Sequence, residues 1–369
     1  MEMIKGFWAN MPKFNKKHEK SHTNRPFFVL APMADVTDFP FRQIISSKGN
    51  PDVFWTEFVS ADGLAHPVAR EKLLIDLKFT PNQHPIVAQI FGSNKENIKS
   101  ASELCRELGF DGIDINMGCP DRSIEKQGAG ASMIKNFELA REIIESAREG
   151  AGNIPVSVKT RIGYNKNEID TWIRNLLTLK LPVLTVHLRT RKEMSLVPAH
   201  WELMREIIKL RDEISPETLI IGNGDILNIE DGYKKASETG CDGLMLGRAI
   251  FGNPWLFRNK DKIKQEHNLK STNNFLLKIF SARTSRSTQG FLNYAPALRE
   301  KLLTLVEHTE LFEKELIDYK SFAIMKKHYK AYVNGFDGAK DLRVLLMDAK
   351  DSQEVKNIIN DFLAKSDIL

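Results

Sequence analysis

Cysteine is scarce in this sequence, and its spacing argues against the sites that cysteine most often builds. Only 3 of the 369 residues are cysteine: Cys105, Cys119 and Cys241. An odd, widely spaced set without a C-x-x-C pair argues against a disulfide framework and against a zinc site. We therefore expect no metal, a reducing compartment and, by default, the cytoplasm.

Long apolar runs are absent as well. No stretch approaches the roughly 18 apolar residues that a membrane-spanning helix needs, so we expect no membrane partner. The N-terminal stretch lacks an apolar run followed by a small-residue cleavage site, and Glu2 and Glu19 disfavour a transit peptide. Residues 1–25 are basic and show no clear period, so we interpret them as a flexible extension.

Neither sign of charge dominates. The formal net charge is +5, and the hydrophobic and charged fractions of 42% and 27% are typical of globular proteins. An excess this small indicates an anionic partner only where the positive charge is clustered, since phosphate backbones reward grouped lysines and arginines.

From Phe27 onward, short apolar runs alternate with amphipathic helical stretches, a pattern typical of parallel βα units. The predicted strands are Phe27–Leu30, Val53–Glu57, Ile86–Ile90, Gly112–Asn116, Val156–Thr160, Val183–His187, Leu219–Asn223 and Gly243–Gly247. Eight strands with helices between them indicate a (β/α)8 TIM barrel. The alternative, an open doubly wound sheet, usually has fewer strands and a glycine-rich fingerprint after the first, which is absent here.

After Phe257 the alternation stops. A polar stretch leads into segments at 291–312, 320–336, 339–350 and 352–365 that read as helices. We therefore predict an α/β barrel over residues 26–265 and a smaller all-α domain over 285–369, with the boundary in the 260–290 region.

Polar and ionisable residues gather where the predicted strands end, which is where barrels carry their chemistry. They fall at residues 31–34, Gln89, 116–119, 159–161, 187–191, 223–225 and 247–248. Ionisable groups at the ends of otherwise apolar strands are expensive unless they converge on a ligand, so this distribution favours a binding site.

The last two strands both end in glycine-containing loops, GNGD at 222–225 and GR at 247–248. Each loop alone is more often a tight turn. Two of them on consecutive strands favour a phosphate group held by backbone N–H groups, with Arg248 as a charged partner.

Three further side chains suit a delocalised ring. Lys159 is either a snorkelling lysine at a strand end or a cation that faces a delocalised anion such as a reduced flavin. Gln89 and Asn116 can both donate and accept hydrogen bonds at a ring edge. For His187, a packed histidine satisfied by the backbone is an equal alternative.

Cys119 lies between Gly118 and Pro120 in a loop at the same end of the barrel. Buried packing is the usual role of a cysteine, and we assign it to Cys105 and Cys241. A thiol is mostly protonated at neutral pH, so Cys119 can act as a general acid.

A set of motifs resembles one known family. APMADVTDFPFR, AQIFG, DINMGCP, GAGASMIKN, VSVKTRIG, HLRTR, GNGDI and LMLGRAIFGNPWLF follow the order and spacing of the tRNA-dihydrouridine synthases. The resemblance covers about residues 27–257 and continues more weakly into KKHYKAYVNGFDGAKDLR. One departure is Leu188, where the family often has glycine, and the resemblance assigns no role to the basic N-terminal extension.

The resemblance implies a cofactor and a reaction. It implies FMN contacts with Pro32, Met33, Ala34 and Gln89, a ring near Lys159 and His187, and a phosphate against Asn223, Gly224, Asp225, Gly247 and Arg248. NADPH would reduce the flavin. A hydride would then pass from flavin N5 to C6 of a uracil in tRNA, while Cys119 protonates C5.

A uracil in folded tRNA is stacked, so the enzyme must extrude it and draw affinity from charge elsewhere. Lys326, Lys327 and Lys330 fall close together on one predicted helix, and Arg189 and Arg191 lie at the predicted barrel mouth. We expect these five residues to contact tRNA, although a solvated face is the usual role of a charge cluster.

Two alternatives remain beside a tRNA-dihydrouridine synthase that works as a monomer. One is another FMN barrel oxidoreductase acting on a small molecule, which has no need of a basic helical appendage. The other is a non-redox RNA-binding protein on the same fold, for which loss of Cys119 or Lys159 would be the sign; both are present.

Overall fold

The computed structural model describes residues 3, 5–11, 25–260 and 294–365. Two compact units divide the chain. The first comprises Met1–Arg42, Pro51–Leu227 and Asp231–Arg248, and the second comprises Gln43–Asn50, Asn228–Glu230 and Ala249–Leu369. The predicted linker at 260–290 falls almost wholly outside the described residues.

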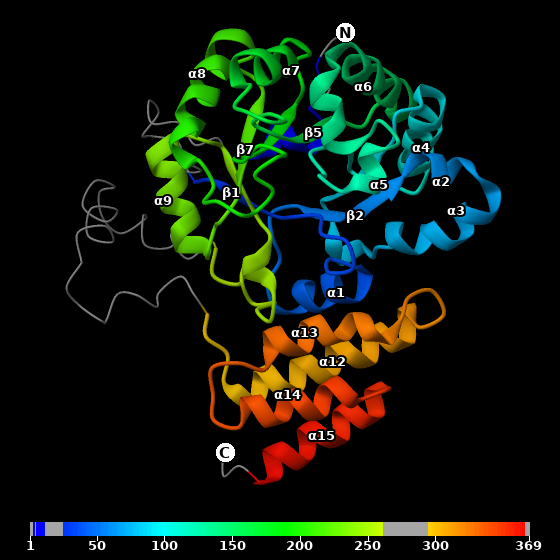
Figure 1. Ribbon diagram of the computed structural model, residues 1–369, viewed down its shortest axis with the longest axis vertical. Coiled ribbons are helices and arrows are strands. Elements are labelled where there is room, and N and C mark those ends of the chain that lie inside the picture. The colour runs from blue at the N-terminus through cyan, green and yellow to red at the C-terminus, as the bar shows by residue number, and fades with distance from the viewer. Residues whose placement is uncertain (1–2, 4, 12–24, 261–293, 366–369) are drawn as a thin grey trace. The chain divides into compact units, whose positions relative to one another are not determined.

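The first unit is the predicted barrel of eight parallel strands (Figure 1). They are β1 (Phe27–Leu30), β2 (Phe54–Ser60), β3 (Ile86–Phe91), β4 (Gly112–Met117), β5 (Val156–Arg161), β6 (Val183–His187), β7 (Leu219–Asn223) and β8 (Gly243–Leu246). All eight predicted strands are confirmed to within a few residues at each end. The order runs β1-β8-β7-β6-β5-β4-β3-β2. A parallel bridge between Val29 and Val53 joins the two outer strands and closes the barrel.

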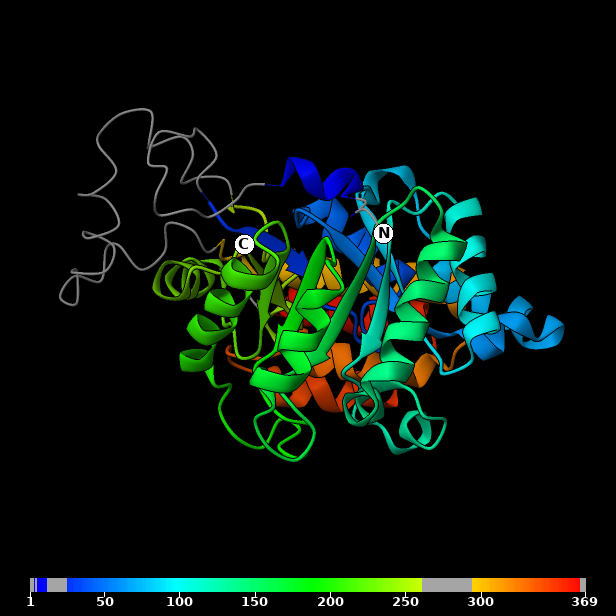
Figure 2. The ribbon, with the colours of Figure 1, turned by 90° about the horizontal axis from the view of Figure 1, so that it is seen from above.

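Helices lie outside the strands of this unit (Figure 2). They are α1 (Phe39–Lys48), α2 (Ala61–Ala65), α3 (Pro67–Leu73), α4 (Lys95–Glu107), α5 (Arg122–Glu125), α6 (Phe137–Ala151), α7 (Arg174–Thr178), α8 (Met204–Ile214) and α9 (Ile229–Thr239). Of these, residues 43–48 of α1 and 229–230 of α9 belong to the second unit. The longer ones follow their sequence signals. Asn94 caps α4 by accepting from the Asn97 N–H at 2.9 Å, and Gly152 ends α6 with a φ of 61°.

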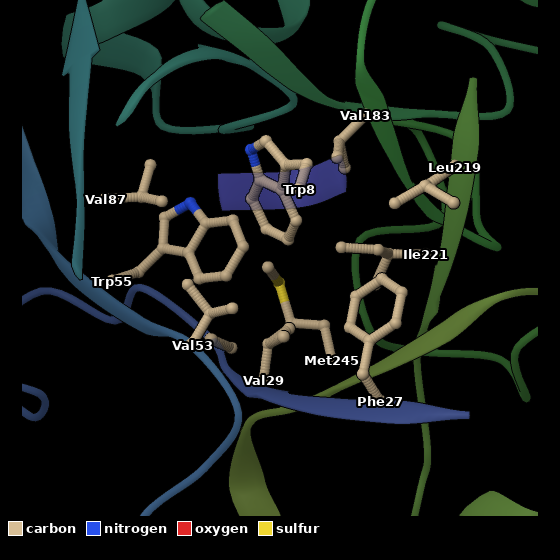
Figure 3. Close-up of a cluster of buried hydrophobic side chains, with 11 residues drawn as sticks. Trp8, Phe27, Val29, Val53, Trp55, Val87, Val183, Leu219, Ile221 and Met245 are labelled. Atoms are coloured by element: carbon tan, nitrogen blue, oxygen red, sulfur yellow. The ribbon is translucent and has the colours of Figure 1, made fainter. Parts of the chain in front are cut away.

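The end of the barrel where the strands begin is filled by apolar side chains around Trp8 (Figure 3). Trp8 lies in a short 3-10 helix, Gly6–Asn10, and is 2% exposed. Its ring centroid is 5.8 Å from that of Trp55 and 6.0 Å from that of Phe27. The expectation of a flexible extension is therefore wrong for residues 5–11, because this segment plugs the barrel.

The described residues of the second unit include α12 (Leu298–Leu316), α13 (Met325–Tyr332), α14 (Ala339–Asp348) and α15 (Ser352–Lys365). The helical fold predicted for this part of the chain is confirmed. The core of these helices includes Leu302, Phe312, Tyr329, Leu346 and Ile359, all fully buried. Among the residues described, no helix is both long and apolar enough to cross a membrane.

Candidate active site

A cavity of about 240 Å³ opens at the carboxyl ends of the barrel strands, opposite the Trp8 plug. Its lining comes from β1, β5, β6, β7 and β8 and the loops that follow them. The lining residues are Ala31, Pro32, Met33, Lys159, His187, Arg189, Ser195, Asn223, Gly224, Asp225, Ile226, Met245, Gly247 and Arg248. Nine of these are residues for which the sequence predicts cofactor contacts, so the fold brings together side chains that lie more than 200 positions apart.

One carboxylate organises the side of this cavity that is formed by the loops after β6, β7 and β8. Asp225 accepts hydrogen bonds from Arg189, from Arg248 and, at 2.9 Å, from the Ala199 backbone N–H. Burial raises the pKa of Asp225, but the hydrogen bonds and charges of Arg189 and Arg248 outweigh it and hold this pKa below its ordinary value. The Arg248 side chain is 66% exposed, so its guanidinium remains accessible to an anion.

Glycine is required at position 224. Its φ is +124°, and a Cβ there would lie 2.8 Å from the Ala199 Cβ and 3.2 Å from the His187 ring. The backbone of Gly224 can therefore form the edge of the cavity, where a side chain would fill it. The Gly224 carbonyl accepts from Trp201 Nε1 at 2.8 Å, which fixes this loop.

Lys159 and His187 face the cavity with altered acidities. Burial and the nearby Arg161 guanidinium lower the pKa of Lys159 to about 8. Burial, together with Arg161, Lys159, Arg189 and Arg248, lowers the pKa of His187 well below its ordinary value. Lys159 is therefore a cation whose charge is lost as pH rises through about 8, whereas His187 is neutral.

Gln89 and Asn116 are not among the residues that line the cavity, and they form a hydrogen-bonded chain with Asp114. Gln89 Nε2 donates to Asp114 Oδ2 at 2.6 Å, and Asn116 Nδ2 donates to Gln89 Oε1 at 3.0 Å. Asn116 Oδ1 accepts from the Gly118 and Cys119 backbone N–H groups at 3.1 and 2.9 Å. The chain links the barrel interior to the loop that carries Cys119.

Cys119 itself lies in the loop between β4 and α5 and is partly buried. Burial raises the pKa of its thiol above the ordinary value, so the thiol is protonated at neutral pH. Arg161 Nε, at the end of β5, donates to the Gly118 carbonyl at 2.7 Å and so fixes this loop. Cys105 and Cys241 are fully buried, which confirms their predicted packing role.

Other predicted residues lie elsewhere. Ala34 is exposed and does not line the cavity. Arg189 is 2% exposed and bonded to Asp225 and to the Val197 carbonyl, while Arg191 forms an ion pair with Glu125. Both arginines thus have partners inside the protein, and contact with tRNA stays a prediction for each.

The predicted lysine cluster lies on α13. Lys327 and Lys330 are exposed and Lys326 is partly exposed, on the face opposite the buried His328 and Tyr329. Within the part of the chain that the structure describes, none of the three lysines forms an ion pair.

Two residues of the site, Asp114 and Ser195, are not among those that the sequence predicts. Asp114 could have been recognised, because it stands two residues before Asn116 in a strand and therefore lies on the same face. Ser195 had none, since it reaches the cavity through the fold of a loop.

A closed parallel barrel with a cation-lined cavity at the carboxyl ends of its strands places the first unit in the (β/α)8 class of folds. The family model described as "Dihydrouridine synthase (Dus)" matches residues 29–367. The chain belongs to this family of oxidoreductases.

Curated relatives match the chain over almost its whole length. The "Probable tRNA-dihydrouridine synthase 2" of Bacillus subtilis (strain 168) is 40% identical over 364 residues, 98% of this chain and 98% of the relative. The "Probable tRNA-dihydrouridine synthase" of Staphylococcus aureus (strain Mu50) is 38% identical over 368 residues, 99% of this chain and 98% of the relative.

Proposed function

We propose that the protein reduces a uridine of tRNA to 5,6-dihydrouridine, with FMN as cofactor and NADPH as reductant. The relatives' names support the substrate, and near-complete coverage of both chains supports carrying the activity over. The observation that carries the chemistry is the placement of Lys159 in the wall of a cavity whose other side is built around Gly224 and Arg248.

The residues of the cavity fit FMN. Arg248 and the backbone at Gly224 and Gly247 suit a phosphate, because a guanidinium and close-approaching backbone N–H groups both bind phosphate oxygens. The Lys159 ammonium suits the negative charge that a reduced flavin carries near N1 and C2=O. Met33, Pro32 and Ala31 line the cavity and would supply apolar contact for the flavin ring.

When bound, FMN supplies the hydride for C6 of the uracil. The chain then has to supply a proton at C5, and Cys119 holds one, since burial keeps its thiol protonated. Asn116 and Arg161 fix the loop that carries this thiol. Lys159 stabilises negative charge in the cavity, and neutral His187 can hydrogen-bond there without adding charge.

We also propose that the α13 lysines contribute to tRNA binding. Lys326, Lys327 and Lys330 present grouped positive charge on one side of a helix, and none of the three is committed to an ion pair within the described residues. Phosphate contacts of this kind give affinity without sequence information, so they suit a protein that must hold a folded RNA.

An anaerobic assay on purified protein tests the proposal. The protein is reconstituted with FMN, its flavin is bleached by reduction with NADPH, and the reduced protein is mixed with tRNA that lacks dihydrouridine. We expect the flavin band to return and mass spectrometry to find a tRNA nucleoside two mass units heavier than uridine, because reduction adds two hydrogens. A reducible flavoprotein that ignores tRNA would instead favour a small-molecule oxidoreductase.

A further inference from the structure

Asp114 is a fully buried carboxylate at the centre of β4 that the proposed chemistry leaves without a role. Its neighbours on both adjacent strands donate to it. Ser157 Oγ on β5 donates to Oδ1 at 2.6 Å, and Gln89 Nε2 on β3 donates to Oδ2 at 2.6 Å. The carboxylate therefore closes one end of the chain that runs through Gln89 and Asn116 to the loop of Cys119.

The groups at the two ends of this chain determine how the Gln89 and Asn116 amides are oriented. An ionised carboxylate can only accept, so Gln89 turns its NH2 group toward Asp114 and its oxygen toward Asn116. At the other end, the backbone N–H groups of Gly118 and Cys119 can only donate, so Asn116 turns its oxygen toward them. Both ends require the same direction, and each amide keeps a second N–H.

Stability does not explain the carboxylate. Burial raises the pKa of Asp114 to about 6 in spite of the hydrogen bonds from Ser157 and Gln89 and the positive charge of Lys159, which all lower it. A raised pKa means that the fold disfavours the ionised form. An amide side chain, which can make both hydrogen bonds without a buried charge, would be tolerated better at this position, so the charge points to a functional requirement.

We propose that Asp114 is a positioning residue that sets the direction of the Gln89 and Asn116 amides, so that both present N–H donors to the cofactor side of the barrel. This inference rests on the proposed function for the cofactor, but the hydrogen-bond chain belongs to the protein alone. It can therefore be tested in protein without FMN as well as with it.

We call the chain of Asp114, Gln89 and Asn116 the amide relay. The test exchanges the carboxylate at position 114 and the amide at position 116. In Asn116→Asp, a second carboxylate faces the oxygen of Gln89, and at neutral pH no orientation of that amide satisfies both neighbours. Adding Asp114→Asn reverses the relay: the new amide at position 114 donates to the Gln89 oxygen, and the Gln89 NH2 group donates to the carboxylate at position 116. That carboxylate still accepts from Gly118 and Cys119. Asp114→Asn alone removes only the charge. Its amide can accept from Gln89 and donate to Ser157, but it can also donate to Gln89, so only the Gly118 and Cys119 N–H groups still impose the direction of the Gln89 amide.

Two measurements are made on wild type, both single variants and the double variant: thermal unfolding without FMN, and FMN affinity by fluorescence quenching. We expect Asn116→Asp to melt several degrees lower and to bind FMN on the order of tenfold more weakly. The double variant should melt above Asn116→Asp, whereas Asp114→Asn should melt no lower than wild type yet bind FMN a few-fold more weakly. Rescue by a second substitution is not expected of a residue that merely fills space.

The pH profile gives an independent sign. Lowering the pH from 8 to 6 should raise the melting temperature of Asn116→Asp relative to wild type, because a protonated carboxyl at 114 or 116 can donate to the Gln89 oxygen. A double variant that loses at least the sum of the two single losses would overturn the proposal. If wild type binds no FMN, the proposed function fails, but the unfolding data still decide the role of Asp114.

Discussion

The guanidinium of Arg189 donates to Nε2 of His187 at 3.0 Å. Because arginine can only donate, Nε2 must accept, and the imidazole is therefore neutral with its proton on Nδ1. The same guanidinium is bonded to Asp225, so one buried arginine fixes both the histidine tautomer and the loop after β7.

His187 should not titrate in the neutral range. Burial and four surrounding cationic side chains lower its pKa well below the ordinary value, so the neutral form persists as pH falls through 6.5. Nitrogen NMR shifts of the imidazole between pH 8 and pH 5.5 should show an unprotonated Nε2 throughout. A titration midpoint near 6.5 would show that the Arg189–His187 bond does not form in solution.

Lys159 should give the reductive half-reaction its alkaline limb. Its ammonium is present below a pKa of about 8 and is lost above it. The kcat/KM for reduction of the flavin by NADPH should therefore fall as pH rises through about 8. Lys159→Met should lower the reduction rate at pH 7 by on the order of tenfold and remove this limb. Lys192→Met, which removes an exposed lysine from the loop after β6, is the control and should change neither. An unchanged alkaline limb in Lys159→Met would assign it to another group.

Trp8 should matter for stability and not for chemistry. Trp8→Ala removes a side chain that is 2% exposed and packed against Trp55 and Phe27, and should lower the free energy of unfolding of the barrel by about 3–5 kcal/mol. Denaturant unfolding followed by circular dichroism measures the loss, and Trp8→Phe should retain most of the stability. FMN affinity in native conditions should stay unchanged, because the cavity lies at the other end of the strands; a large loss would show that the plug also shapes the active site.

The α13 lysines should set the salt dependence of tRNA binding. Replacing Lys326, Lys327 and Lys330 together by Gln should weaken binding and reduce the slope of log K against log salt by roughly 1 for each phosphate that is no longer neutralised. The control replaces three barrel-helix lysines, Lys95, Lys99 and Lys209, by Gln and removes the same charge. Equal effects in both triple variants would mean that net charge, and not this cluster, governs binding.

The sequence predicted those parts of the fold that depend on local pattern. All eight strands lie within a few residues of their predictions, because buried parallel strands are short, apolar and bounded by breaks in the pattern. The cavity lining followed from the same register, since polar residues at the ends of parallel strands must meet at one edge.

What the sequence did not predict depends on contacts between distant positions. Trp8 stands in a stretch without period, and its packing partners begin at Phe27 and extend to Met245. Arg189 is buried because Asp225, 36 positions away, offers a carboxylate under the loop. Neither partner can be identified from a local window, so both residues looked like parts of mobile or solvent-facing segments.

We propose that the cavity binds the flavin and that Cys119 supplies the proton for C5, and Cys119→Ala tests this separation of roles most directly. Rapid mixing under anaerobic conditions follows flavin bleaching by NADPH and flavin reoxidation by tRNA in wild type, in Cys119→Ala and in Cys241→Ala, whose thiol is fully buried. We predict bleaching at close to the wild-type rate in all three, and reoxidation slower by at least roughly a hundredfold in Cys119→Ala alone. Reoxidation of Cys119→Ala by tRNA at the wild-type rate would contradict the account, because the proton for C5 would then come from another group.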